Sequence, residues 1–140
     1  PMSALLREGA EGRRFPYHVL KLVRASNNRG ILHERIERRF LRMLELGFED
    51  EVRGLWARGD LTTGLPAMRC VGYRQMLKYL LGEYIFDEMV QRGIAATRQL
   101  AKRQYTWLRA ENQTNWLVDG HRPVERALDM LARRLLRGER

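Results

Sequence analysis

The amino-acid sequence predicts a mainly α-helical protein with one or two β-strands. Five segments combine a helical spacing of apolar residues with flanking cap-type or glycine residues. Only two short segments have the composition of strands. With 44% hydrophobic and 31% charged residues over 140 positions, the composition is that of one globular domain.

The first predicted element is a strand over residues 15–23, after a glycine-punctuated loop over residues 1–14. A strand needs a neighbour with which to pair its backbone groups, and residues 115–118 are the only other strand candidate. The chain also begins at Pro1 rather than at a methionine. Both observations lead us to expect part of a longer protein, in which a missing half completes the sheet.

Helices are predicted over residues 31–46, 49–58, 70 or 72–81, 86–110 and 122–137. The first follows the cap-type residues 26–28 and ends at Gly47. At 100° per residue, its apolar face comprises Leu32, Ile36, Phe40, Met43 and Leu44. An adjoining face carries Arg35, Arg38, Arg39 and Arg42.

The longest predicted helix, over residues 86–110, has an apolar arc that we expect to face the core. The arc comprises Phe86, Met89, Val90, Gly93, Leu100, Trp107 and Leu108. Thr97 and Gln104 lie in the same arc, and a buried Gln104 amide would need either neighbouring backbone or a polar site as its partner. Arg98, Lys102 and Arg109 form a separate stripe, whereas Arg92 and Arg103 lie on the other flank.

The net charge of +9 is concentrated in two stretches that contain no acidic residue. Residues 61–82 carry three basic residues and residues 89–110 carry five, so together they account for eight of the nine net charges. A concentrated positive field favours a polyanionic partner. A solvated basic face without a partner would have the same composition.

Several classes of function are excluded by the sequence. There is no Gly-Lys pair and hence no phosphate-binding loop, no Cys/His spacing typical of a zinc site, and no G-x-S-x-G motif. The longest apolar runs are far too short to span a membrane, no signal segment is visible, and the lone Cys70 cannot form an internal disulfide. We therefore expect a cytoplasmic protein, with Cys70 as a small buried residue rather than a nucleophile.

Two polar motifs resemble signatures of the bacterial tRNA dimethylallyltransferase family, which transfers isopentenyl groups. The first is Leu-Pro-Ala-Met-Arg-Cys-Val-Gly-Tyr-Arg-Gln over residues 65–75. The second is Thr-Arg-Gln-Leu-Ala-Lys-Arg-Gln over residues 97–104, continued by Thr-Trp-Leu-Arg over residues 106–109. Residues 32–40 and 47–52 are also similar to the family, so the resemblance runs from about residue 15 to residue 118.

This resemblance implies an enzyme that moves a dimethylallyl group from dimethylallyl diphosphate to the exocyclic amine of the adenine 3′ of a tRNA anticodon. It implies a phosphate-loop-kinase-like α/β core and a magnesium ion held mainly by the missing half. Because the family's phosphate loop and general base also lie in that half, we expect the isolated chain to be inactive. The target base must leave the anticodon stack, which requires cationic surfaces for RNA and a pocket for the base.

By resemblance, Arg39 is a residue that stabilises the diphosphate, and Arg35 is a weaker candidate that an ion pair with a nearby Glu would explain equally well. The resemblance also implies tRNA contacts in two segments. The predicted contacts are Ala67, Met68, Arg69, Cys70, Val71, Gly72, Tyr73, Arg74, Arg98, Leu100, Ala101, Lys102, Arg103, Gln104, Tyr105, Thr106 and Trp107. In this context we expect Gln104 to belong to a polar site, and Trp107 to be a core residue rather than a stacking platform.

We therefore predict three regions: a lead-in over residues 1–14, the C-terminal part of a transferase core over residues 15–120, and a C-terminal helix over residues 121–140. The predicted partners are the tRNA anticodon stem-loop and dimethylallyl diphosphate, with no membrane, in a monomer. The alternative is a stand-alone helical RNA-binding module without a reaction of its own. A helical protein-interaction domain would explain the core but not the charge segregation. The reading frame upstream of Pro1 would discriminate the first two.

Overall fold

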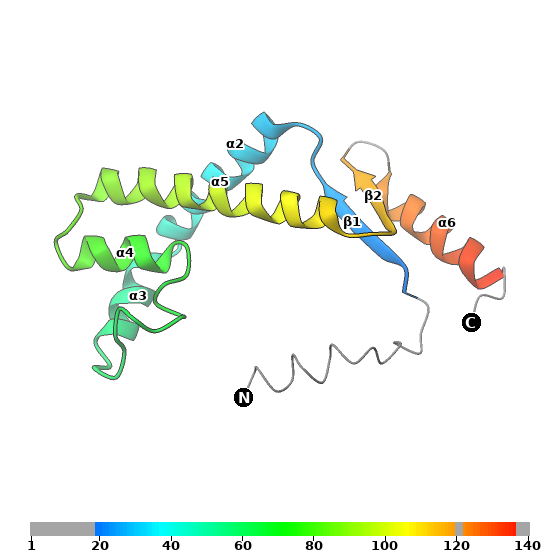
Figure 1. Cartoon of the computed structure of the whole chain (residues 1–140). Helices are drawn as coiled ribbons and strands as arrows, with labels where there is room; N and C mark the ends of the chain where they lie inside the picture. Colours follow the sequence, from blue (N-terminus) through cyan, green and yellow to red (C-terminus); the bar gives the residue numbers. More distant parts are fainter. Residues whose placement is uncertain (1–18, 120–121, 137–140) are drawn as a thin grey trace. The chain divides into compact units, whose positions relative to one another are not determined.

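The computed structural model describes residues 19–119 and 122–136, and this part of the chain is mainly helical, as predicted (Figure 1). The predicted loop over residues 1–14 lies outside the described residues. The elements in chain order are β1 (Lys21–Ala25), α2 (Arg29–Glu45), α3 (Phe48–Trp56), α4 (Tyr73–Leu80), α5 (Phe86–Ala110), β2 (Thr114–Val118) and α6 (Pro123–Leu136). All five helices and the second strand lie within two residues of their predicted ends, apart from the alternative start of α4 at residue 70.

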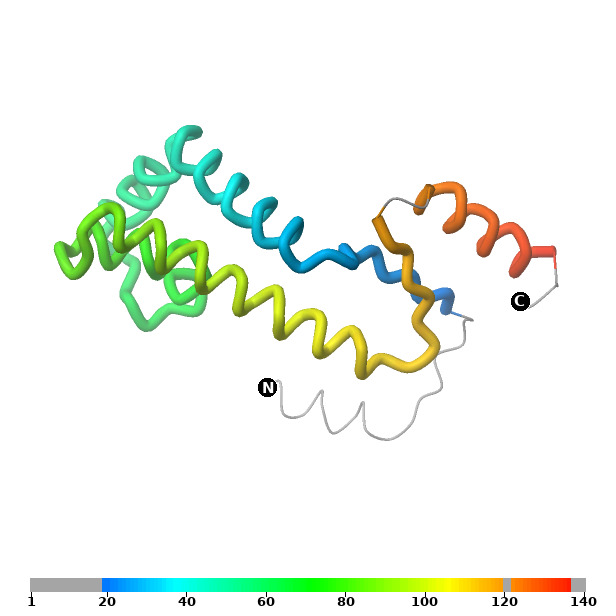
Figure 2. The backbone as a smooth tube through the Cα atoms, turned by 90° about the horizontal axis from the view of Figure 1, so that it is seen from above, coloured from blue at the N-terminus to red at the C-terminus, as the bar shows by residue number. Residues whose placement is uncertain are grey.

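The described chain forms two compact units. The helical unit, Ser26–Asn112, contains α2, α3, α4 and α5, and the strand unit contains β1, β2 and α6. In the helical unit, α2 and α5 run in opposite directions, so the start of α2 lies near the C-terminal half of α5 (Figure 2).

The strand unit consists of two parallel strands and the helix that follows them. Lys21 of β1 is paired with Thr114 of β2, and the register continues to Ala25 and Val118. The first strand therefore begins later than the predicted range of residues 15–23, of which residues 15–18 lie outside the described residues. β1 has five residues, as β2 does, and each residue of β1 is paired with one of β2.

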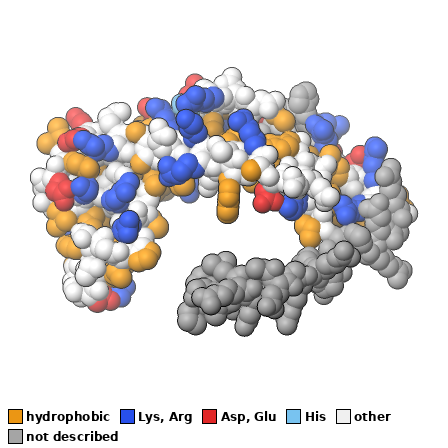
Figure 3. All heavy atoms as spheres, in the orientation of Figure 1, with side chains coloured by type: hydrophobic (Ala, Val, Ile, Leu, Met, Phe, Trp, Pro, Cys, Tyr) orange, Lys and Arg blue, Asp and Glu red, His pale blue; other side chains and the backbone are white. Residues whose placement is uncertain are grey.

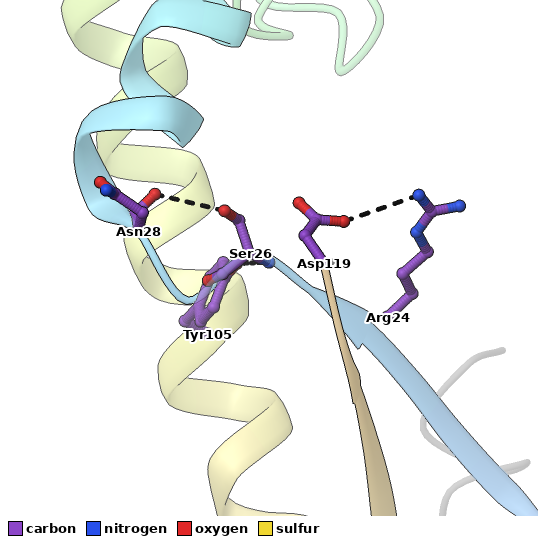
Figure 4. Close-up of polar contacts among 5 residues, drawn as sticks. All are labelled: Arg24, Ser26, Asn28, Tyr105 and Asp119. Atoms are coloured by element: carbon purple, nitrogen blue, oxygen red, sulfur yellow. Dashed lines mark hydrogen bonds and ion pairs between the residues drawn. The ribbon is translucent and has the colours of Figure 1, made fainter. Parts of the chain in front are cut away.

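An ion pair lies at the end of this small sheet, where Arg24 Nη2 is 3.6 Å from Asp119 Oδ1 (Figure 4). Val23 of β1 and Leu117 of β2 are buried. Helix α6 packs against β2, but none of its described side chains is buried.

Side chains from four helices form the core of the helical unit. The buried cluster consists of Phe40 from α2, Phe48 and Val52 from α3, Met76 from α4, and Met89, Val90 and Ile94 from α5. The predicted apolar face of α2 supplies Phe40 directly, and Ile36, Met43 and Leu44 pack against the cluster. Phe48 packs edge-on against both Phe40 and Tyr73.

The start of α2 is fixed by a side-chain cap. Asn28 has extended backbone angles, and its Oδ1 accepts hydrogen bonds from the N–H groups of Gly30 and Ile31 at 2.8 and 3.3 Å. These bonds satisfy donors that a helix start otherwise leaves unpaired. The predicted cap over residues 26–28 is confirmed, with Asn28 as the capping residue.

Helix α5 packs closely only along its first half. At Gly93 a Cβ atom would overlap the Phe40 ring, so a residue without a side chain is needed there. The buried stretch ends at Ile94. The prediction that Trp107 belongs to the core is wrong, because its side chain is 80% exposed, and Leu100 is 36% exposed. Beyond Ile94, α5 extends past the core cluster, so no core side chains cover the rest of its apolar arc.

A positive φ of 94° at Gly72 shapes the entry into α4. Such backbone favours glycine, and the Gly72 N–H donates to Gln75 Oε1 at 2.9 Å. The prediction that Cys70 is buried is wrong. Its thiol is exposed and donates to the Pro66 carbonyl at 3.4 Å, because the connector that holds it runs over the surface.

Candidate nucleic-acid interface

A basic cleft of about 350 Å³ lies between the start of α2 and the C-terminal half of α5. It is lined by four cationic side chains and one histidine, and no acidic side chain lines it. The residues of this cleft are Ser26, Asn27, Arg29, Leu32, His33, Arg98, Gln99, Lys102, Tyr105, Thr106 and Arg109. We refer to it as the α2–α5 cleft.

Helical spacing explains why α5 contributes so many of these residues. Arg98, Lys102, Tyr105 and Arg109 follow one another by four, three and four positions, which places them on one face of the helix. The basic stripe predicted from the sequence, Arg98 with Lys102 and Arg109, is therefore gathered along one cavity.

Tyr105 joins the two walls of the cleft. Its hydroxyl accepts a hydrogen bond from the Ser26 N–H at 2.9 Å and lies 3.1 Å from the Ser26 carbonyl, to which it donates (Figure 4). Ser26 Oγ in turn donates to the Asn28 carbonyl at 3.3 Å. The backbone that leads into α2 is thereby fixed against α5.

Each cation of the cleft has a different environment. Arg98 donates to Glu37 at 2.8 Å, but its Nε is buried and has no hydrogen-bond partner among the described residues. Arg29 Nε donates to His33 Nε2 at 3.4 Å, and the Arg109 guanidinium lies 5.8 Å from the Tyr105 ring centre. The Lys102 ammonium has no partner in the described part of the chain.

The field of the cleft is positive and little neutralised. Lys and Arg side chains gather along α2 and α5 in the space-filling view (Figure 3). The first turn of α2 contains no acidic residue, so its N-terminal dipole adds to the positive potential. Such a surface attracts phosphate groups, which guanidinium groups bind in a bidentate manner.

A shallower groove of about 490 Å³ runs along the neighbouring face of α5. It shares Gln99, Lys102 and Thr106 with the cleft and adds Arg103, Trp107 and Ala110. Helix α5 therefore lines both the α2–α5 cleft and this groove, and both contain basic side chains. The exposed Trp107 ring lines this groove, where it is available as a stacking surface.

The predicted contact segment over residues 67–74 has mixed exposure. Met68 is 2% exposed and Gly72 is also buried, whereas Ala67, Arg69, Cys70 and Arg74 are exposed. The Met68 side chain therefore supports the connector from within, while the exposed residues remain available to a partner.

Tyr73 stands at the first position of α4. Its hydroxyl donates to Glu51, and this hydrogen bond, more than burial, raises the pKa of Tyr73 above its usual value of 10.0. The phenol therefore stays protonated at neutral pH and links the start of α4 to α3.

The two arginines proposed for the diphosphate, Arg39 and Arg35, are exposed on α2 and line neither the cleft nor the groove. Gln104 is likewise exposed and lines neither of them. These three assignments stay predictions.

Sequence reasoning did not identify the α2 wall of the cleft. Arg29 and His33 are spaced by four residues directly after the cap residue Asn28. That spacing is a signal of a polar face at a helix start. That Arg29 and His33 line the same cleft as Arg98 depends on how α2 and α5 pack, which the sequence alone does not show.

The described residues contain neither a candidate metal centre nor a candidate membrane span. No group of three or more His, Cys, Asp or Glu side chains in residues 19–119 and 122–136 could hold a metal ion. Within the same ranges, no helix has both the length and the apolar character needed to cross a bilayer.

The chain belongs to the IPP transferase family, whose model matches residues 1–111. The resemblance that the sequence motifs indicated is thereby confirmed. Among solved structures, the full-length tRNA isopentenylpyrophosphate transferase from Bacillus halodurans is 27% identical with a TM-score of 0.80, and the match covers 94% of this chain and 44% of that one. The tRNA delta(2)-isopentenylpyrophosphate transferase from Staphylococcus epidermidis shares the fold, with 22% identity, a TM-score of 0.73, and coverage of 96% and 42%. The chain spans less than half the length of these two structures.

Proposed function

We propose that the chain is the C-terminal part of a tRNA dimethylallyltransferase. The enzyme transfers a dimethylallyl group from dimethylallyl diphosphate to the exocyclic amine of the adenine 3′ of the tRNA anticodon. This part binds the anticodon stem-loop and helps to hold the diphosphate. Family membership and the matches to two longer transferases support the proposal.

The observation that carries the proposal is the coincidence of the α2–α5 cleft with the predicted tRNA-contacting motif. Arg98, Lys102, Tyr105 and Thr106 belong to that motif, and all four line the cleft. Four cations without a lining acid suit the phosphates of an RNA backbone. The shallower groove that Trp107 lines, which we call the stacking groove, suits unpaired bases of a loop.

The proposed mechanism uses this surface to expose the reacting amine. RNA contacts along α5 would compensate for the loss of stacking when the adenine is turned out of the anticodon loop. Arg39 is exposed and has no partner among the described residues, so its guanidinium is available to stabilise charge on the departing diphosphate.

The magnesium ion that the resemblance implies does not fit the described residues. They gather no group of three or more His, Cys, Asp or Glu side chains that could hold it. We assign its binding to parts of the enzyme other than the described residues.

The alternative is an RNA-binding module without a reaction of its own, which the basic lining of the α2–α5 cleft would also suit. Labelled dimethylallyl transfer to tRNA by the full-length protein would support the enzyme. Salt-dependent RNA binding without transfer would support the module.

Salt-dependent RNA binding tests the role of the cleft. We expect Arg98→Ala and Lys102→Ala each to weaken binding of an anticodon stem-loop RNA and to reduce the slope of log K against log salt by about one unit. The reason is that each substitution removes a phosphate contact and the counterions that this contact releases. Fluorescence anisotropy at several salt concentrations measures the slope.

Arg53→Ala is the matched control, since Arg53 is exposed, pairs with Glu49 on α3 and lies outside the cleft. Slopes that stay equal to the wild-type slope would show that Arg98 and Lys102 do not contact phosphate. If the wild-type chain showed no salt-sensitive RNA binding, a protein-interaction domain would be the better explanation.

A further inference from the structure

A second basic cleft, of about 370 Å³, lies between α4 and α5. Three cationic side chains line it, Arg74 and Lys78 from α4 and Arg92 from α5, and no acidic residue does. Its other lining residues are Gln75, Tyr84, Ala95 and Ala96. Apart from Arg74, no residue of this cleft belongs to the predicted tRNA contacts. We call it the α4–α5 cleft.

Tyr84 holds two of these cations in place. The Lys78 ammonium lies 5.3 Å from the centre of the Tyr84 ring, and the Arg92 guanidinium lies 4.7 Å from it. Both also pair with carboxylates that do not line the cleft, Lys78 with Glu83 at 2.6 Å and Arg92 with Glu88 at 2.8 Å. These hydrogen bonds raise the pKa of both cations, so both keep their charge.

The side-chain amide of Gln75 also lines the cleft. Gln75 is only 5% exposed, and its Oε1 accepts the Gly72 N–H, which fixes the orientation of the amide. The Gln75 NH₂ group therefore remains a donor, and it has no partner among the described residues. This donor is not among the buried side-chain atoms that lack a partner, so solvent reaches it in the cleft, where an acceptor group can take the place of water.

We infer that the α4–α5 cleft is a second phosphate-binding site, which takes a backbone phosphate of the same RNA. The inference rests on the proposed function. Two guanidinium groups, one ammonium group and one amide NH₂ supply donors only, which matches the acceptor oxygens of a phosphate. The Arg74 guanidinium has no partner in the described part of the chain, so it can bind an anion without breaking an ion pair.

The geometry of α5 connects this cleft to the stacking groove. Arg92 and Arg103 are eleven residues apart, which is three helical turns, so they lie on one face about 16 Å apart along the axis. An RNA strand that follows this face can place one phosphate between α4 and α5 and a base beside Trp107. Continuity along α5 favours a backbone phosphate over a free phosphate ion.

The test compares variants of the full chain against two probes, an anticodon stem-loop RNA and inorganic phosphate alone. We expect Lys78→Ala combined with Arg92→Ala to reduce the salt slope of RNA binding by about one unit. Gln75→Glu, which keeps the acceptor for Gly72 but replaces the donor, should weaken RNA binding in the same direction. Arg58→Ala is the control, because Arg58 is exposed, pairs with Asp60 and lies outside both clefts.

The outcomes separate this inference from the proposed function. If the double variant keeps the wild-type slope while Arg98→Ala and Lys102→Ala lower it, the second site is overturned and the proposed function stands. If the double variant loses binding of inorganic phosphate but keeps its RNA slope, the cleft takes a free anion and the RNA assignment is overturned. Loss of salt dependence in the wild-type chain would overturn both. Circular dichroism confirms that each variant is folded.

Discussion

At the scale of a single residue, Tyr105 fixes the start of α2 against α5 and so determines the geometry of the α2–α5 cleft. One hydroxyl bonds to both the N–H and the carbonyl of Ser26, immediately before the capped start of α2. The partly buried backbone groups of Ser26 would otherwise need water or another partner. The same ring lies near the Arg109 guanidinium, so the residue that joins the two walls of the cleft also positions one of its cations.

We predict that Tyr105→Phe destabilises the helical unit by about 1–2 kcal/mol, because two hydrogen bonds are lost while the ring remains. Urea unfolding followed by circular dichroism measures the change. Tyr79→Phe is the control, since Tyr79 packs edge-on against Phe86 and no hydrogen bond of its hydroxyl is seen in the described residues. Equal stabilities of the Tyr105 variant and the wild type would show that solvent replaces the Ser26 bonds without cost.

At the scale of an element, the two halves of α5 differ in burial and in charge. Its first half is packed from Met89 to Ile94, and its second half is exposed and basic. Gly93 belongs to the packed half, where it allows the Phe40 ring to approach the helix backbone. Helix interiors ordinarily disfavour glycine, so its presence here is explained by packing rather than by helix propensity.

Gly93→Ala should therefore destabilise the chain by about 1–3 kcal/mol, although alanine is the better helix former, because the added methyl group must displace Phe40. Thermal and urea unfolding measure the change. Gly54→Ala in α3 is the matched control: nothing lies within 4 Å of the position of its Cβ, and we expect it to stabilise by about 0.5–1 kcal/mol. Equal effects of the two substitutions would contradict close packing at Gly93.

The same helix shows what the sequence could predict. Its bounds, its basic stripe and the cap of α2 depend on local spacing and local hydrogen bonds, and all three were predicted. The exposure of Trp107 was not, because periodicity identifies an apolar face but not how far the neighbouring helices extend along it. The Arg29 wall of the cleft was missed for a similar reason, since it depends on tertiary packing.

At the scale of the whole molecule, the excess positive charge and the apolar core lie mainly in the same unit. The two acid-free stretches, residues 61–82 and 89–110, both lie in the helical unit, Ser26–Asn112, and supply six of the seven cations that line its two clefts. Of the eleven buried apolar side chains in the described residues, nine belong to the same unit, and the others are Val23 and Leu117. The proposed binding surface therefore lies in the better-packed part of the chain.

This distribution predicts unequal local stability. A sheet of two strands is marginal in water, and α6 exposes its leucines, with Leu128 61% and Leu135 72% exposed. We therefore expect amides of β1, β2 and α6 to exchange with solvent at least about tenfold faster than those of α2 and α5, a difference of about 1.4 kcal/mol or more in opening free energy. Hydrogen-exchange mass spectrometry of the 140-residue chain measures both sets together. Tyr105→Phe, which acts within the helical unit, should raise exchange in α2 and leave the strand unit unchanged. Equal protection of both units in the wild type would show that they open as one cooperative body.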